Sequence, residues 1–215
     1  MVTNRLFVLA LWLFMLAACS KAPAPVQPLR VGAVVVVIGD SLVAGTGARP
    51  DEAWPSALGR STGWSVVNAG VPGDTSAAAL LRLPDLLEHH RPDAVIIAVG
   101  GNDFLRNVPL GHTRENLEAL VQTSKVAAGH VALMGVPRVS MAGAAFGALS
   151  DHELFGEIAG EHDVLLVPGA IADTLSRAQL RSDRIHANAE GYAFMAAQVY
   201  DVLVRHGWAD AGKGR

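Results

Sequence analysis

The chain of 215 residues is 51% hydrophobic and 17% charged, a composition that excludes a disordered or low-complexity protein. Its 17 Lys and Arg against 20 Asp and Glu give a net charge of −3, which offers no basic footprint for a nucleic acid. The single cysteine excludes an internal disulfide framework and any multi-cysteine metal site. The length fits one sizeable domain preceded by a distinct N-terminal segment.

Residues 1–18 have the pattern of an export signal. Arg5 is followed by the apolar run Leu6–Ala18, and a helix of that length would rise about 20 Å, short of the ~30 Å core of a membrane. The pattern therefore favours a signal peptide over a permanent span. The run ends in Leu16-Ala17-Ala18-Cys19, which resembles a bacterial lipobox, so we expect Cys19 to be lipidated. The alternative is an ordinary cleaved signal in which Cys19 is incidental.

The residues after Cys19 predict where the protein is held. Ser20 follows the cysteine, whereas Asp at that position is the usual signal for retention in the inner membrane, so the outer membrane is favoured. Residues 19–30 contain Pro23, Pro25 and Pro28 and are typical of an extended tether. We expect residues 31–215 to form the folded domain, lipid-anchored in the bacterial cell envelope and facing the periplasm.

Short aliphatic runs alternate with helical stretches through this domain. The predicted strands are 33–38, 65–67, 94–99, 131–134 and 164–167, each apolar enough to be covered on both faces. The predicted helices include 113–128, one opened by a capping box at Ser150–Glu153, and 189–205. This alternation predicts a doubly wound α/β fold, a three-layer α/β/α sandwich with a five-stranded parallel sheet. Sites in such sheets lie in the loops at the carboxyl ends of the strands.

The loop after the first predicted strand reads Gly39-Asp40-Ser41-Leu42. Gly39 permits a tight exit, and Ser41 at a helix start would project its hydroxyl into the crevice. The alternative is a serine that acts only as a helix N-cap. The glycines are misplaced for the Gly-x-Ser-x-Gly elbow of α/β-hydrolases, and no Gly-Lys-Ser/Thr follows for a phosphate loop.

Two further loops bring backbone close to the same crevice. The loop Asn68–Thr75 contains two glycines and a proline, so that its backbone can approach a ligand at Gly73; plain turn chemistry is the alternative. After the third strand, Gly100-Gly101-Asn102-Asp103 places a neutral amide donor at Asn102, which suits a transient oxyanion. The alternative at Asn102 is an Asx-turn that closes the strand.

Near the C-terminus, Asp183 lies three residues before His186. This separation allows the carboxylate to fix the imidazole tautomer while the other ring nitrogen accepts a hydroxyl proton. None of the eight histidines shows a metal-binding spacing such as His-Glu-x-x-His.

Together and in this order, these motifs resemble the SGNH (GDSL-type) hydrolase family over residues 31–205. The resemblance points to its branch of bacterial periplasmic thioesterase/lysophospholipase enzymes and arylesterases. Further phrases that carry it are Trp54-Pro55, Val66–Ala69, Gly73–Ser76 and Leu81–Pro84. One departure is Ala187, where the family often has Pro after the histidine; it weakens inference about the substrate more than about catalysis.

The resemblance implies a role for each matching residue. Ser41 is the nucleophile, His186 with Asp183 is the base pair, and Ser41, Gly73 and Asn102 are the oxyanion donors; no metal or cofactor is required. In this branch, two loops frame the acyl pocket, which implies Phe104, Val108, Met141 and Phe146 as substrate contacts. The alternative for these four is that they only cover the edge of the sheet.

The sequence therefore predicts a monomeric serine esterase that acts through an acyl-Ser41 intermediate. Its substrates would be small-molecule or lipid esters: aryl or short- to medium-chain acyl esters, lysophospholipids or acyl thioesters. The alternative is a catalytically silent envelope lipoprotein that binds lipid or glycan. A nucleotide binder is disfavoured by Asp40 and Asp74 beside the would-be phosphate site.

Overall fold

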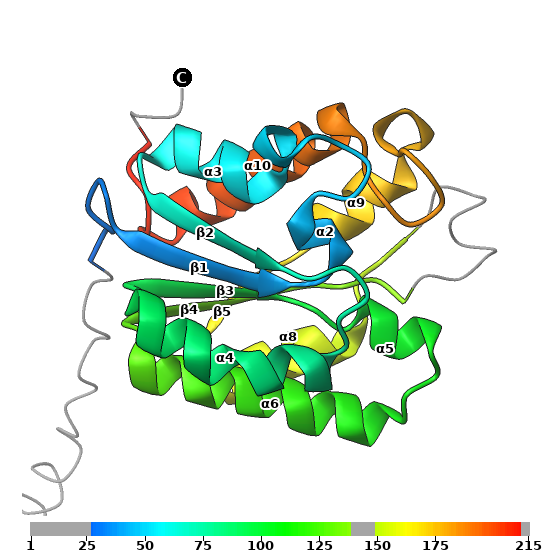
Figure 1. Cartoon of the computed structure of the whole chain (residues 1–215), viewed down its shortest axis with the longest axis horizontal. Helices are drawn as coiled ribbons and strands as arrows, with labels where there is room; N and C mark the ends of the chain where they lie inside the picture. The colour runs from blue at the N-terminus through cyan, green and yellow to red at the C-terminus, as the bar shows by residue number, and fades with distance from the viewer. Residues whose placement is uncertain (1–26, 139–148, 212–215) are drawn as a thin grey trace, which may run out of the picture.

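A five-stranded parallel sheet forms the centre of the domain (Figure 1), seen in a computed structural model that describes residues 27–138 and 149–211. The strand order is β2-β1-β3-β4-β5, and every neighbouring pair is parallel. The strands are β1 (Val34–Gly39), β2 (Ser65–Gly70), β3 (Ala94–Ala98), β4 (His130–Met134) and β5 (Leu165–Val167). The predicted α/β class with a five-stranded parallel sheet is confirmed.

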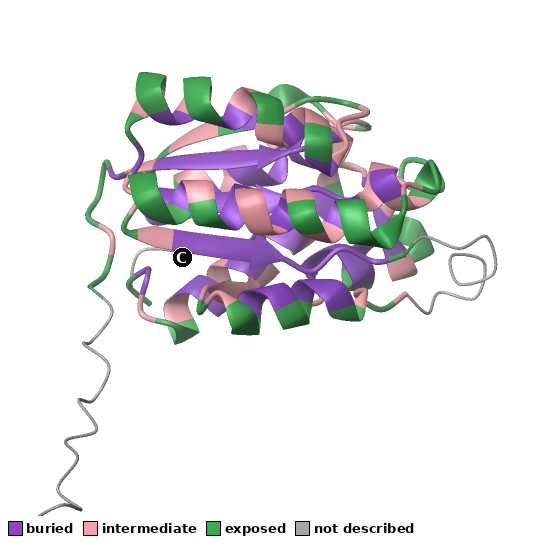
Figure 2. Cartoon of the chain, turned by 90° about the horizontal axis from the view of Figure 1, so that it is seen from below, coloured by how far each residue is buried: buried purple, intermediate pink, exposed green. Residues whose placement is uncertain are grey.

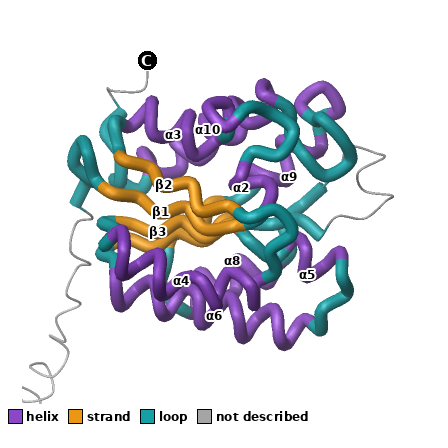
Figure 3. Tube along the Cα trace, in the orientation of Figure 1, coloured by secondary structure: helices purple, strands orange, loops and turns teal. Residues whose placement is uncertain are grey.

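Helices cover both faces of the sheet and complete three layers (Figures 1 and 3). One face carries α2 (Ser41–Ala44), α3 (Trp54–Thr62), α9 (Ala170–Ser176) and α10 (Ala189–Arg205). The other carries α4 (Ser76–His90), α5 (Gly101–Leu105), α6 (Leu110–Ala127) and α8 (Glu153–Glu161). Two short 3₁₀ helices, η1 (Pro50–Glu52) and η2 (Ala178–Leu180), lie in the connections.

The core lies between these layers, and burial follows the position of each strand. All of β3 and nearly all of β1 are buried, because helices pack against both faces (Figure 2). Strand β2 lies at an edge of the sheet, and its residues Val66 and Val67 are only partly buried. The expectation of a strand fully covered on both faces is therefore wrong for β2, and also for β5 at the opposite edge, where Leu165 and Leu166 are only partly buried.

Two predicted helix starts differ from the structure. Helix α6 begins at Leu110 rather than Thr113, directly after Pro109, which has no N–H to satisfy and a ring that restricts its backbone. Helix α8 begins at Glu153 with His152 as its N-cap, so the capping box at Ser150 is wrong. The reason is long-range, since residue 151 forms an antiparallel bridge with Pro137 that extends the chain up to His152.

The predicted site loops and the N-terminal segment lie at opposite ends of the sheet. The loops with the predicted site residues leave the carboxyl ends of the strands (Figure 1). Near the amino ends lies Leu29, two residues after the described chain begins at residue 27, and its N–H donates to the Trp208 carbonyl at 2.9 Å. None of the described helices is long and apolar enough to cross a membrane. The predicted signal peptide, and Cys19 with it, lies outside the described residues.

Candidate active site

Ser41 is the first residue of α2, directly after β1. The Asp40 side chain caps this short helix by accepting from the Leu42 N–H at 2.9 Å. Gly39 is required at the strand exit, because a Cβ there would lie 2.3 Å from the Ala98 carbonyl oxygen. The Ser41 hydroxyl donates to Nε2 of His186 at 3.0 Å, across 145 residues of sequence.

His186 lies in the loop before α10, between the serine and a carboxylate. Its Nδ1 donates to Oδ2 of Asp183 at 2.7 Å, while Oδ1 accepts the N–H groups of Ile185 and His186 at 2.8 and 2.9 Å. Partial burial pushes the pKa of Asp183 upward, but the hydrogen bonds from the His186 ring and these two N–H groups outweigh it and hold the pKa below its ordinary value. The carboxylate therefore stays ionised and fixes the ring.

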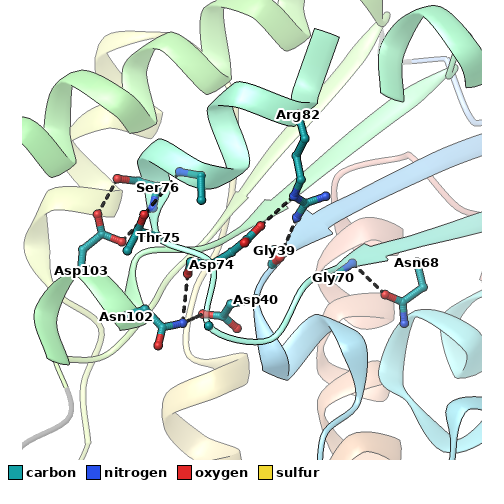
Figure 4. Close-up of polar contacts among 12 residues, drawn as sticks. Gly39, Asp40, Asn68, Gly70, Asp74, Thr75, Ser76, Arg82, Asn102 and Asp103 are labelled. Atoms are coloured by element: carbon teal, nitrogen blue, oxygen red, sulfur yellow. Dashed lines mark hydrogen bonds and ion pairs between the residues drawn. The ribbon is translucent and has the colours of Figure 1, made fainter. Parts of the chain in front are cut away.

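Asn102 is the second residue of α5, and it lies next to Asp74, which follows Gly73 in the loop after β2 (Figure 4). The Asn102 amide donates to the Asp74 carbonyl at 3.0 Å and, more weakly, to Oδ2 of Asp40 at 3.4 Å. Gly73 has φ +86°, a backbone conformation that favours glycine, and its carbonyl accepts from Arg106 at 2.8 Å. The structure thus joins the Gly73 loop to the start of α5 through the Asp74 carbonyl.

A buried carboxylate strengthens this junction. Asp103 is fully buried and accepts from both the N–H and the hydroxyl of Ser76, at 2.8 and 2.5 Å (Figure 4). Asn116 donates in turn to the Ser76 hydroxyl at 3.1 Å. The start of α4 and the start of α5 are therefore tied together beside the contact between Asn102 and Asp74.

Asp40 is the second buried carboxylate of the site, with 5% of its surface exposed. Burial is the main reason why the pKa of Asp40 is raised to about 6, and the nearby charges of Asp74 and Asp103 also raise it. The hydrogen bond from the Leu42 N–H and the charge of the nearby His186 lower this pKa, but they do not outweigh burial. Both oxygens accept hydrogen bonds, one from Leu42 and one from Asn102. An amide could not accept on both sides, which explains a carboxylate at this position.

An apolar hollow opens beside Ser41 and Asn102. Besides these two, its lining consists of Asp40, Leu42, Gly101, Leu105, Val136, Pro137, Ile171, Leu175 and Ile185. The lining is drawn from the start of α2, from α5 and α9, and from the loops after β4 and before α10. Leu105 and Ile185 lie within three residues of Asn102 and His186, so the sequence motifs point to their neighbourhood. Ile171 and Leu175 were missed, because no local pattern indicates that α9 turns this face toward Ser41.

Two of the four predicted substrate contacts, Phe104 and Val108, do not line this hollow. Phe104 stacks on His152 with ring centroids 5.0 Å apart, and Arg138 lies 5.5 Å above the ring. Val108 is half-buried and does not line the hollow. Met141 and Phe146 lie outside the described residues.

Among the described residues, one group has the spacing of metal ligands. Glu118, Glu161 and His162 bring one ligand atom each within 4.8 Å of one another, on α6 and at the end of α8. Arg114 already forms ion pairs with Glu118 at 3.2 Å and with Glu161 at 3.1 Å. Both carboxylates are already paired with a cation of the chain itself, and none of the three residues belongs to the cluster around Ser41.

The sequence matches the GDSL-like lipase/acylhydrolase family over residues 37–194. It is 33% identical over 180 residues to thioesterase 1/protease 1/lysophospholipase L1 of Escherichia coli K12, covering 80% of this chain and 85% of that protein. It is 29% identical over 210 residues to an arylesterase of Vibrio mimicus, covering 94% and 98%.

Solved structures agree with these sequence matches. The structure of TesA superposes with a TM-score of 0.71 and 28% identity, covering 80% of this chain and 99% of that one. The esterase EstA of Pseudoalteromonas sp., inhibited by monoethylphosphonate, superposes with a TM-score of 0.69 and 27% identity, covering 80% and 97%.

Proposed function

The chain belongs to the GDSL-like lipase/acylhydrolase family and is an esterase/acylhydrolase of that family; we propose that it hydrolyses carboxylic esters through an acyl-Ser41 intermediate. The observation that carries the proposal is the unbroken chain of contacts from Ser41 Oγ to His186 Nε2 and from His186 Nδ1 to Asp183. A serine hydroxyl is a weak nucleophile unless an adjacent base accepts its proton, and this arrangement supplies that base.

The first half of the reaction acylates Ser41. As Oγ attacks the ester carbonyl carbon, its proton passes to Nε2 of His186, and the imidazolium that forms is stabilised by the ionised Asp183. The tetrahedral intermediate then collapses, and His186 gives the proton to the leaving alcohol or thiol. In the second half, His186 takes a proton from water, which attacks the acyl-Ser41 carbonyl; as the second tetrahedral intermediate collapses, His186 returns the proton to Ser41 Oγ and the acid is released.

Three donors receive the charge that develops on the carbonyl oxygen. They are the backbone N–H groups of Ser41 and Gly73 and the amide of Asn102. In the free protein, one Asn102 contact is to the Asp74 carbonyl and the longer one, at 3.4 Å, is to Asp40. The long contact is the weaker one, so the amide hydrogen directed at Asp40 is the one available to the oxyanion. A single donor of this kind typically lowers the barrier by ~2.7–4 kcal/mol.

The hollow beside Ser41 supports apolar acyl or aryl groups. Leu105, Ile171 and Leu175 offer apolar contacts next to the nucleophile, and no charged side chain other than Asp40 lines the hollow within the part of the chain that the structure describes. The names of the relatives, an arylesterase and a thioesterase/lysophospholipase, are consistent with such substrates. Met141 and Phe146 remain proposed substrate contacts, along with Phe104 and Val108.

For the cellular location we propose a lipid anchor at Cys19, in the outer membrane, with the domain facing the periplasm. The support is the short apolar run that ends at a lipobox-like sequence.

A silent lipid- or glycan-binding role is not favoured, because binding alone has no need of a serine hydrogen-bonded to a histidine–carboxylate pair.

A panel of p-nitrophenyl esters of rising acyl length tests the proposed activity on the purified mature protein. We expect hydrolysis of short- and medium-chain esters, with a rapid release of nitrophenol in the first turnover if deacylation is slower. Ser41→Ala should reduce kcat to the background rate while its Tm stays close to that of the wild type. An active Ser41→Ala protein would contradict the proposal.

A further inference from the structure

Arg82 lies on α4, outside both the triad and the apolar hollow, in the segment Leu81–Pro84 that the proposed mechanism leaves without a role. Its guanidinium reaches two different loops of the site (Figure 4). Nε donates to Oδ2 of Asp74 at 2.7 Å, and Nη2 donates to the carbonyl oxygen of Gly39 at 2.9 Å. Arg82 therefore connects the end of β1 to the loop that follows β2.

Both acceptors of Arg82 are adjacent to the proposed oxyanion donors. Gly39 stands two residues before Ser41, and Asp74 follows Gly73 directly. The Asp74 carbonyl also holds the Asn102 amide, at 3.0 Å. Arg82 is therefore linked to all three donors. The links to Ser41 and Gly73 run along the chain from Gly39 and from Asp74, and the link to Asn102 runs through its hydrogen bond to the Asp74 carbonyl.

The chemistry of the contact requires arginine. The side chains of Arg82 and Asp74 are 24% and 12% exposed, so their ion pair is largely shielded from water. A guanidinium is a rigid planar fork that holds two acceptors in fixed directions, whereas a lysine ammonium is a single point charge on a flexible stem. Replacement by lysine leaves the charge but cannot hold both loops in one geometry.

We infer that Arg82 is a positioning residue of the esterase site, which fixes the donors of Ser41, Gly73 and Asn102 relative to one another by joining Asp74 to Gly39. The inference rests on the proposed acyl-Ser41 mechanism. Oxyanion stabilisation depends on donors that are already in place when charge develops, so loosening this link raises the barrier without weakening substrate binding.

Steady-state kinetics of Arg82→Ala and Arg82→Lys test this role. We expect kcat to fall about 10- to 100-fold in Arg82→Ala, with KM close to the wild-type value, and Arg82→Lys to recover only part of the loss. Arg60→Ala is the matched control, because Arg60 also donates from a helix to a backbone carbonyl, that of Asp51, but away from the site. Its kcat should equal that of the wild type.

Chemical rescue distinguishes positioning from general stabilisation. Arg82 borders an open surface depression with Asp85 and His89, which gives a small molecule access to the vacated space. Methylguanidine should restore kcat of Arg82→Ala, whereas methylammonium at the same concentration should not. In an Asn102→Ala background, the loss caused by Arg82→Ala should be smaller than in the wild type, because one of the three donors that Arg82 positions is already absent.

A lowered Tm with kcat within about twofold of the wild type would show that Arg82 only stabilises the fold, and would overturn the inference. If Arg82→Ala does not fold, Arg82→Lys decides the matter, and a wild-type kcat in that variant overturns the inference equally. Ser41→Ala is measured alongside. Activity in Ser41→Ala defeats the proposed function itself, whereas an inactive Ser41→Ala with a fully active Arg82→Ala defeats only the role of Arg82.

Discussion

The amide of Asn102 gives the first prediction at the scale of single residues. Because its role as a donor is realised only when charge develops on the substrate oxygen, Asn102→Ala should lower kcat by ~10²–10³ with little change in KM. Single-turnover kinetics measure the chemical step directly. A variant with wild-type kcat would remove Asn102 from the oxyanion hole.

The carboxylate of Asp183 acts by fixing the imidazole. In Asp183→Asn, the amide that replaces Oδ2 presents N–H to Nδ1, so the ring is driven to the tautomer that is protonated at Nε2 and cannot accept the Ser41 proton. A loss of kcat of up to ~10⁴ is expected. His186→Ala removes the base itself and should cost at least as much; a His186→Ala protein that kept most of the wild-type rate would refute the arrangement.

Asp40 links the site to stability through its raised pKa. Because the folded protein holds this proton up to about pH 6 and the ordinary value is 3.8, the stability contributed by the protonated group is lost as pH rises through this window. Asp40→Asn does not titrate, so its stability relative to the wild type should rise between pH 4 and pH 7, by up to about 3 kcal/mol. Urea unfolding of both proteins across this range measures the difference, and a pH-independent difference would contradict it.

At the scale of elements, α4 offers two leucines that differ only in the face they occupy. Leu83 is fully buried against the core, whereas Leu81 is 84% exposed. Leu83→Ala should cost about 2–5 kcal/mol in the free energy of unfolding, because it leaves a cavity, and Leu81→Ala should stay within about 0.5 kcal/mol. Denaturant titrations of the two variants should separate them clearly; equal losses would place α4 differently on the sheet.

Local patterns predicted those elements whose signals lie within a few residues. Helix α10 has the predicted bounds, because Asn188 supplies its N-cap and the apolar residues recur at helical spacing up to Arg205. The start of α8 was misplaced, because the bridge between residue 151 and Pro137 is a contact that short windows cannot contain.

The residues of the site also fall into those that a local motif indicates and those that only long-range packing brings to the site. The sequence could single out Ser41, Asn102 and His186, because each stands in or beside a short motif: the first two follow β1 and β3, and the third lies three residues after Asp183. The contact of Arg82 with Gly39 spans 43 residues and follows from the packing of α4 on β1, which no local spacing encodes.

At the scale of the whole molecule, the described chain begins near the amino ends of the strands, and α2, which begins with Ser41, lies at their carboxyl ends (Figure 1). A lipid at Cys19 would therefore be attached to the end of the domain remote from Ser41. Globomycin should make expressing cells accumulate the unprocessed precursor, and Cys19→Ser should move the protein from the membrane to the soluble fraction. A mature N-terminus at Lys21 or beyond, without an acyl chain, would contradict the anchor.

The identity of the nucleophile is the central claim, and one measurement addresses it directly. The mature protein is treated with a fluorophosphonate probe, digested and examined by mass spectrometry to locate the modified residue. The account predicts a single phosphonylated serine at Ser41, with no labelling of Ser41→Ala, and slow labelling of His186→Ala because the base is missing. Attachment of the probe to a different serine, or equal labelling of Ser41→Ala, would contradict it.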